Sequence, residues 1–329
     1  MECLICSSNQ VKIRYQGVDG FRIDRKFDIY SCRTCKVSFT HPFLTDEEYS
    51  EFHNAHQVAF NGVGDNDLVD EYINNKEIYW RKLRFIKRLS EIKKIHPNAN
   101  SILDIGCGAG FFLDYLKNNG YIVSGIELSP WGYSVAKKTL NLNVKNSLIE
   151  DIKPPKKKLD IITMYDVIEH TTDPLNTLDS VKKWLNKNGY LIINLPNIDS
   201  FVSKASGKYW NKLSPPDHTL HFNRYSISHL LNKSGYKIVN IATNSGSAQE
   251  SMSQLAGGLW RVPARFSNSL TNALDLQNKS FSQNKSAAVA AIKGSKKVAE
   301  GLGFAAKPLI PVINKMGKGE GLRVIAQPV

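Results

Sequence analysis

A carboxylate followed by three alternate glycines forms the first stretch of this sequence that could do chemistry. The mostly apolar residues 102–105 contain Asp104 and lead directly into the turn, whose glycines are Gly106, Gly108 and Gly110. Glycine lets a ligand approach the backbone where a Cβ would collide, and it tolerates positive φ. The spacing departs from the GxGxxG turn that holds a pyrophosphate on a helix N-terminus. Because Asp104 would repel a pyrophosphate, the pattern predicts a site for a cationic ligand.

A second carboxylate stands at the end of the next predicted strand. Residues 102–105 and 121–126 have the apolar pattern of buried parallel strands, and the pattern between them predicts a helix. Glu127 ends the second strand, 17 residues past the last glycine of the turn. A carboxylate in that place can accept hydrogen bonds from both hydroxyls of a ribose diol. The two strands therefore predict one site for a ribose-containing ligand.

The glycine turn resembles motif I of the class I methyltransferases, which bind S-adenosylmethionine. The motif is DIGCGAG, residues 104–110. The resemblance implies an α/β fold with a seven-stranded Rossmann-like sheet, and it puts Asp104, the three glycines and Glu127 in the cofactor site. In this family the adenine contacts follow the third strand, where the chain has NSLIED. We name Ser147 and Leu148 there.

A stretch after the fourth predicted strand carries the candidate proton chemistry. Its residues 165–174, YDVIEHTTDP, resemble motif IV of the same enzymes, in the group shared with ubiquinone-pathway O-methyltransferases and several sugar methyltransferases. Open parallel sheets bind ligands at the carboxyl ends of their strands, so we expect Asp166, Glu169 and His170 beside the transferable methyl group. A neutral imidazole can take a hydroxyl proton. His170 is therefore the first candidate base, and the alternative is a histidine that caps or packs the next helix.

Residues 197–225 resemble the lid of this methyltransferase group. Two titratable rings, His218 and His221, are expected over the pocket as further catalytic candidates. Trp210 and Tyr225 are expected to offer surfaces on which a sugar can stack. A zinc site at the HxxH spacing is the competing interpretation, but it lacks a third nearby ligand and the glutamate of HExxH.

Two CxxC pairs predict a metal site near the N-terminus. Cys3 and Cys6 form one pair, and Cys32 and Cys35 form the second after 25 intervening residues. Four thiolates on two tight turns present a tetrahedral ligand set, which is how structural zinc holds together a small module. No open coordination position is implied. A zinc module before the catalytic domain also resembles a family of glycan-associated methyltransferases.

The predicted parts form one large α/β domain with small additions. In chain order they are a zinc ribbon in residues 1–55, an amphipathic lead-in helix in residues 56–97, the methyltransferase core in residues 98–243 with its lid, a loose helical basic insertion in residues 244–316, and the last sheet strand in residues 317–329. A chain of 329 residues with 42% apolar residues can bury such a core.

The charge and the absence of long apolar runs limit the partners. No apolar run reaches the roughly 18 residues of a membrane span, so we expect a cytoplasmic protein. The net charge is +13, and residues 241–329 hold 11 Lys and Arg against 4 Asp and Glu. Basic charge favours an acidic partner. In the insertion, the basic charge predicts either peripheral contact with an anionic membrane or binding to the phosphates of a sugar nucleotide. The alternative is an insertion whose basic residues are only solvated.

Together these patterns predict methyl transfer from S-adenosylmethionine, with structural zinc as a second cofactor. The family resemblance favours O-methylation of a saccharide, a sugar nucleotide or a lipid-linked glycan in cell-surface polysaccharide synthesis. A ribosomal or transfer RNA methyltransferase is the first alternative, which suits the charge but lacks the expected Asn/Asp-Pro-Pro-aromatic motif. An inactive scaffold in a glycan-assembly complex is the second. The sequence leaves the acceptor atom and the oligomeric state open.

Overall fold

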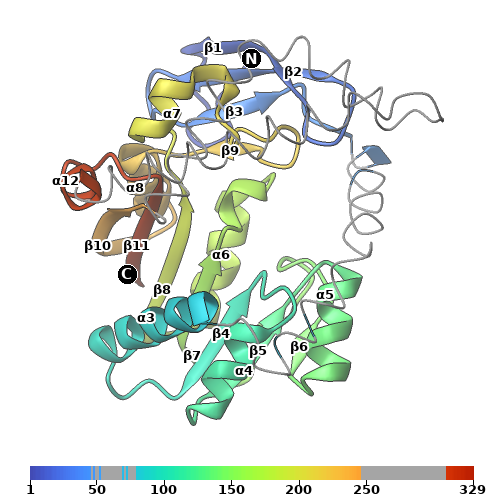
Figure 1. The fold of residues 1–329 in the computed structure, drawn as a ribbon, viewed down its shortest axis with the longest axis vertical. Helices are drawn as coiled ribbons and strands as arrows, with labels where there is room; N and C mark the ends of the chain where they lie inside the picture. Colours follow the sequence, from blue (N-terminus) through green and yellow to red (C-terminus); the bar gives the residue numbers. More distant parts are fainter. Residues whose placement is uncertain (46, 49–51, 53–68, 70–71, 73–78, 246–308) are drawn as a thin grey trace, which may run out of the picture.

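Two β-sheets organise the chain, a four-stranded sheet at the top of Figure 1 and a seven-stranded sheet below it. The computed structural model describes residues 1–45, 47–48, 52, 69, 72, 79–245 and 309–329. The predicted start of the lead-in helix and most of the predicted insertion therefore lie outside the described residues.

The seven-stranded sheet confirms the predicted fold class. Its strands in spatial order are β10 (Tyr236–Asn244), β11 (Gly321–Pro328), β8 (Leu185–Pro196), β7 (Leu159–Tyr165), β4 (Ser101–Ile105), β5 (Ile122–Ile126) and β6 (Val144–Lys145). The strands from β8 to β6 pair in parallel, whereas β11 runs antiparallel to both of its neighbours. The order reverses at β4, so the turns after β4 and β7 open at the same carboxyl edge, where open sheets bind ligands.

Helices cover both faces of this sheet. They are α3 (Tyr79–Ile95), α4 (Phe111–Asn118), α5 (Pro130–Ser134), α6 (Pro174–Trp184) and α8 (Arg224–Lys233), whereas α7 (Phe201–Ser206) packs with β1 and β2 and α12 (Ile310–Lys315) contacts β10. Ile102 lies in the core that α3 and α4 share, whereas Leu103 lies in the core of α6 and α8. Within the described residues, no helix has both the length and the apolar character needed to cross a membrane.

The four-stranded sheet joins the N-terminal segment to the predicted lid. Its strands in order are β1 (Val11–Asp19), β2 (Lys26–Cys32), β3 (Ser38–His41) and β9 (Leu220–His221). β1 and β2 pair in antiparallel orientation as a hairpin. β9 comes from the predicted lid and pairs with β3, where Phe39 lies opposite Leu220. Phe39 also shares one buried core with α6 and α8, so the ribbon is part of the main body.

α6 and β8 follow each other directly in the chain. α6 ends at Trp184, and β8 begins at the next residue. A Cβ on Gly189 would lie 2.9 Å from the carbonyl oxygen of Leu159, so this glycine permits close contact between β8 and β7. Pro311 lies in the first turn of α12, where proline is tolerated.

Candidate active site

The glycine turn after β4 forms an open cradle. All three glycines have positive φ: +69° at Gly106, +56° at Gly108 and +80° at Gly110. A Cβ on Gly106 would lie 2.5 Å from Cγ2 of Val167, whereas a Cβ on Gly108 would meet nothing within 4 Å. Gly106 and Gly110 are therefore needed for packing and backbone conformation. Gly108 leaves the space that a ligand against the backbone requires.

Glu127 lies directly beside this cradle. Its two carboxylate oxygens accept hydrogen bonds from the backbone N–H of Gly108 at 2.6 Å and of Ser129 at 2.7 Å. Each oxygen keeps a second lone pair, so the carboxylate can still accept from two ribose hydroxyls. Burial raises the pKa of Glu127, although the backbone hydrogen bonds oppose the shift. The residues therefore fit the ribose of S-adenosylmethionine.

Asp104 is buried in the strand itself, with 4% of its surface exposed. Burial raises its pKa to about 6, against a hydrogen bond from Thr163 and the charge of Arg88, and with the charge of Glu127 adding to the rise. A cationic group at the turn would stabilise the ionised form of such a carboxyl. This environment suits the sulfonium or ammonium groups of S-adenosylmethionine.

The residues predicted to contact adenine lie in the loop after β6 and are at least partly exposed. Leu148 is 52% exposed and Ser147 is half-buried. The neighbouring Asn146, which the sequence analysis missed, donates hydrogen bonds to the carbonyl oxygens of Glu127 and Leu128 at 2.7 and 2.9 Å. It ties the loop after β6 to the end of β5.

The carboxyl end of β7 carries the second group of predicted residues. Asp166 is exposed and has a φ of +56°, which is strained for a residue with a side chain. Glu169 and His170 follow in a single turn of 3-10 helix, Ile168–His170. The loop before β9 supplies His218. One carboxylate oxygen of Glu169 and one ring nitrogen from each histidine lie within 4.8 Å of one another.

The three side chains of this cluster have different pKa values and therefore different charges. Burial raises the pKa of Glu169 to about 8. Burial would lower the pKa of His170, but the hydrogen bond and charge of Asp217, together with the charge of Glu169, raise it to about 9. Burial and the charge of His170 lower the pKa of His218 to about 3. Near neutral pH the cluster therefore holds one charged ring, one neutral ring and a carboxyl close to its titration point.

Two residues of the predicted lid, Trp210 and His221, have other environments than expected. Trp210 is 3% exposed and packs in a core with residues of β1 and β2, so the prediction of a sugar-stacking surface is wrong there. His221 is 4% exposed, and its Nε2 lies 3.3 Å from the hydroxyl of Thr40 on β3. It therefore holds β9 to the ribbon. Tyr225 is 58% exposed at the start of α8.

The four predicted metal ligands come together at the N-terminus. The Sγ atoms of Cys3 and Cys35 are 3.4 Å apart and those of Cys6 and Cys32 are 3.6 Å apart. All four Sγ atoms lie within 4.8 Å of one another. A tetrahedral zinc ion with bonds of about 2.3 Å separates its sulfurs by about 3.8 Å. The cysteines therefore fit a zinc ion with no open position.

A comparison with protein families assigns the chain. Residues 77–241 match the sequence profile of a methyltransferase domain. This chain belongs to the methyltransferase domain family. The match covers the glycine turn, Glu127 and the Glu169 cluster, but not the four cysteines.

Curated relatives of this family member are ubiquinone biosynthesis O-methyltransferases. The protein of Haemophilus ducreyi is 28% identical over 109 residues, which is 30% of this chain and 46% of the relative. The protein of Coxiella burnetii is 29% identical over 121 residues, 35% of this chain and 50% of the relative. The chain thus spans about half the length of the curated relatives it matches.

Solved methyltransferase structures resemble the fold at low identity. An S-adenosylmethionine-dependent methyltransferase from Archaeoglobus fulgidus is 19% identical, with a TM-score of 0.47, and the match covers 75% of this chain and 94% of that one. The plantazolicin methyltransferase BpumL is 16% identical, with a TM-score of 0.45, over 86% of this chain and 99% of that one.

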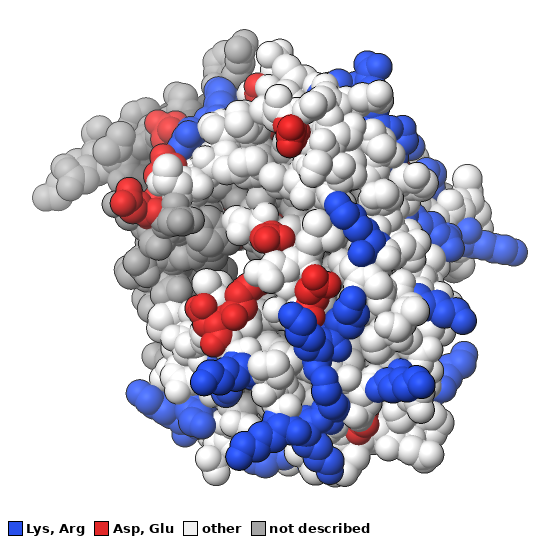
Figure 2. Space-filling model, turned by 180° about the vertical axis from the view of Figure 1, so that it is seen from behind, with Lys and Arg blue, Asp and Glu red and all other residues white. Residues whose placement is uncertain are grey.

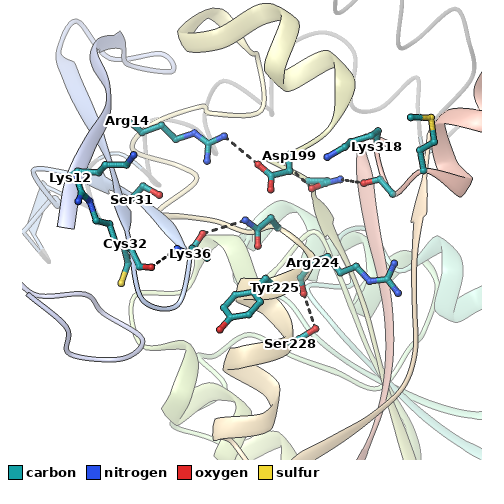
Figure 3. A pocket seen from close by; sticks show the side chains of 15 residues that line it. Lys12, Arg14, Ser31, Cys32, Lys36, Asp199, Arg224, Tyr225, Ser228 and Lys318 are labelled. Carbon is teal, nitrogen blue, oxygen red and sulfur yellow. Dashed lines mark hydrogen bonds and ion pairs between the residues drawn. The ribbon is translucent and has the colours of Figure 1, made fainter. Parts of the chain in front are cut away.

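A basic groove separates the ribbon of this methyltransferase family member from its main sheet. The groove has a volume of about 1250 Å³. Its charged lining residues are Lys12, Arg14, Arg33, Lys36, Arg224, Lys318 and one acid, Asp199. Figure 3 shows Arg14 pointing toward Asp199, to which it is ion-paired at 3.5 Å, and the Tyr225 ring beside Arg224. Figure 2, which views the molecule from behind relative to Figure 1, shows that Lys and Arg also gather over the lower half of that face.

Several residues that organise the site were not predicted. Asp217 is ion-paired with His170, and Thr163 donates a hydrogen bond to Asp104. Thr40 is hydrogen-bonded both to His221 and to the carbonyl oxygen of His218. Asp217 stands directly before His218 in the sequence, so an acid next to a candidate histidine was the available signal. Thr163 and Thr40 had none, because threonine in a strand is ordinary.

Proposed function

We propose that the chain transfers a methyl group from S-adenosylmethionine to a hydroxyl oxygen of a saccharide. When bound, this cofactor supplies a methyl group on a positively charged sulfur, which is a ready leaving group. The observation that carries the proposal is the buried cluster of Glu169, His170 and His218 at the same carboxyl edge as the glycine cradle. That edge is where a parallel sheet brings two ligands together.

The cluster suits the removal of a hydroxyl proton. As the new oxygen–carbon bond forms, the hydroxyl proton must leave to a base. Glu169, with a pKa of about 8, lies closest to the operating pH of an ordinary enzyme, which favours it as proton acceptor. His170, with a pKa of about 9, is suited to orient the acceptor or offset negative charge until it loses its proton. The names of the curated relatives also favour oxygen as the acceptor atom.

The basic groove favours an acceptor that carries phosphate. Among the described residues, six cationic side chains and one acid line it, and Tyr225 adds an exposed aromatic face. A sugar nucleotide or a lipid-linked glycan has both the phosphates and the hydroxylated ring that such a lining would recognise. The same features also favour a second candidate, a ribosomal or transfer RNA acceptor, because cations and an aromatic ring are common in RNA-binding surfaces.

We further propose that the four cysteines hold one structural zinc ion. Two of the groove cations, Arg33 and Lys36, lie in the knuckle that contains Cys32 and Cys35. Zinc would therefore fix part of the groove as well as the ribbon.

Methyl transfer from radiolabelled S-adenosylmethionine tests the acceptor. The panel contains sugar nucleotides, a lipid-linked saccharide, free sugars and ribosomal and transfer RNA. We expect label on a phosphorylated saccharide and a loss of that activity in an Arg33→Gln, Lys36→Gln variant. Label on RNA alone would refute the saccharide proposal and support the second candidate.

A further inference from the structure

Glu169 is a buried carboxylate without a hydrogen-bond partner among the described residues. It is 1% exposed, and neither of its carboxylate oxygens accepts a hydrogen bond from that part of the chain. An ionised carboxylate in such a place is costly unless it is paired, protonated or bound to a metal ion. One ring nitrogen of His170 and one of His218 lie within 4.8 Å of a Glu169 oxygen without a hydrogen bond to it. The three groups are therefore close enough to share one ion.

Hydrogen bonds at Nδ1 fix the tautomer of both histidines. Nδ1 of His170 lies 2.8 Å from the carbonyl oxygen of Asp217, and Nδ1 of His218 lies 2.8 Å from the carbonyl oxygen of Lys212. A carbonyl oxygen can only accept, so each Nδ1 must carry a hydrogen. In the neutral ring the lone pair is then on Nε2. A ligating histidine typically donates its other N–H to a carbonyl or carboxylate in this way.

The backbone fixes the two segments that supply these side chains. The N–H of Thr219 donates to the carbonyl oxygen of Glu169 at 2.9 Å, so the His218 loop is tied to the turn after β7. Asp217 contacts His170 twice, because its carboxylate also lies 3.3 Å from Nδ1. The cluster is thus rigid before any ion enters. The His170 side chain is 29% exposed, which leaves one side of the cluster open to solvent.

We propose that Glu169, His170 and His218 form a binding site for one divalent first-row transition-metal ion, separate from the four cysteines. Two imidazoles and one carboxylate suit ions such as Mn²⁺, Fe²⁺ or Zn²⁺, whereas all-oxygen sites suit Mg²⁺ and Ca²⁺. The set differs from the cysteine cluster, whose sulfurs leave no open position. Here three protein ligands leave positions for water or substrate.

The ion would activate the acceptor, and this role rests on the proposed function, whereas binding of the ion does not. With the ion bound, Glu169 is a ligand and no longer the proton acceptor. A hydroxyl on the ion becomes more acidic and releases its proton to water. Its oxygen then bonds to the methyl carbon of S-adenosylmethionine while the carbon–sulfur bond breaks, with the electron pair staying on sulfur. The charge of the ion would also pair with Glu169, the buried carboxylate that lacks a donor.

Titration of the purified chain with Mn²⁺, followed by electron paramagnetic resonance of the free ion, tests the site. Mn²⁺ is a suitable probe because thiolate sites prefer softer ions. We expect one bound Mn²⁺ per wild-type chain and at least tenfold weaker binding in Glu169→Gln and in His218→Gln. Asp217→Asn keeps all three ligands and should weaken binding by about 10- to 100-fold, the usual range for an outer-shell partner.

Two controls keep the result interpretable. His96→Gln removes a histidine on the far side of the sheet and should bind Mn²⁺ like the wild type, and calorimetry with S-adenosylmethionine checks that each variant is folded. Failure to bind the cofactor would count against the proposed function and leave the Mn²⁺ result unaffected. A wild type that binds no Mn²⁺, or that binds it as weakly as Glu169→Gln does, would overturn the metal site and leave the cluster as a proton-transfer group.

Discussion

The hydroxyl of Thr163 on β7 donates a hydrogen bond of 2.5 Å to the carboxylate of Asp104 on the neighbouring strand β4. The two residues lie opposite each other in the parallel register, and both are buried. The bond favours the ionised carboxylate but does not overcome burial, so the pKa remains raised at about 6. The charge of Asp104 is therefore lost within a pH range that binding experiments can reach.

Affinity for S-adenosylmethionine should depend on this titration. Above about pH 6 Asp104 is ionised and attracts a cationic ligand, whereas below pH 6 it is protonated and the attraction is lost. We expect the affinity to fall as pH decreases from 7 to 5, up to tenfold per pH unit below the pKa. Calorimetry across this range measures it. Asp104→Asn should bind weakly with a flat profile, and an equal slope in the variant would assign the effect to another group.

Two glycines with the same φ allow a matched test of the cradle. Gly108 and Gly207 both have a φ of +56°, and a Cβ on either would meet nothing within 4 Å. Alanine should therefore strain both positions without a clash. We expect Gly108→Ala to lose cofactor binding at least tenfold, because its Cβ enters the ligand space, while Gly207→Ala binds normally. Equal losses would show that backbone strain alone is responsible.

Metal content should follow the four cysteines and not the fifth. We expect about one zinc per chain in the wild type and close to none in the Cys32→Ser, Cys35→Ser variant, measured by elemental analysis of protein purified without added metal. Cys107→Ser is the control, since Cys107 lies in the glycine turn. Zinc retained by the double variant would refute the four-cysteine site.

The proposed catalytic role of the Glu169, His170 and His218 cluster predicts that its variants lower turnover more than cofactor binding. Glu169→Gln, His170→Ala and His218→Ala should each lower kcat by about 10²- to 10⁴-fold, the range for loss of a group that moves a proton. His96→Ala should remain close to wild type. The comparison uses the acceptor found in the labelling experiment. A near-normal kcat in all three cluster variants would remove the cluster from the reaction.

Exposed apolar side chains on α12 and at its two ends make the predicted membrane contact testable. Leu309, Val312 and Met316 are each more than half exposed, and Lys315 and Lys318 are close to them in the sequence. We expect reversible pelleting with anionic vesicles that high salt abolishes and that Val312→Ser, Met316→Ser reduces. Val239→Ser, at an exposed site on β10, is the control. Equal pelleting with neutral vesicles would contradict an electrostatic contact.

The sheet and the cofactor turn were predictable because local sequence determines them. Each buried parallel strand is a short apolar run, and the alternate glycines mark a turn whose φ values are indeed positive. The position of Glu127 in the cofactor site could be predicted from its distance along the sequence, because the helix and strand between the glycine turn and Glu127 have ordinary lengths. The structure puts it 2.6 Å from the backbone of Gly108.

The lid and the cluster partners required tertiary information. Trp210 looks like a ligand-stacking ring in sequence, yet it fills a core that the lid forms with residues of β1 and β2. Asp217 and His170 are 47 residues apart, and neither periodicity nor spacing joins them. The groove could not be predicted from the sequence for the same reason, because its cationic residues come from β1, the second cysteine knuckle, α8 and the turn before β11.

The position of β9 also sets an order of events during synthesis. The ribbon strands leave the ribosome first, but their fourth strand follows much later, since Thr40 and its partner His221 are 181 residues apart. At roughly 5 to 20 residues per second this delay is about 10 to 40 s. During that time β3 has an unpaired edge, and Val37 and Phe39, fully buried in the finished fold, have no core to cover them. A nascent chain that has already captured zinc would therefore still need a chaperone, or rapid translation, to protect this edge.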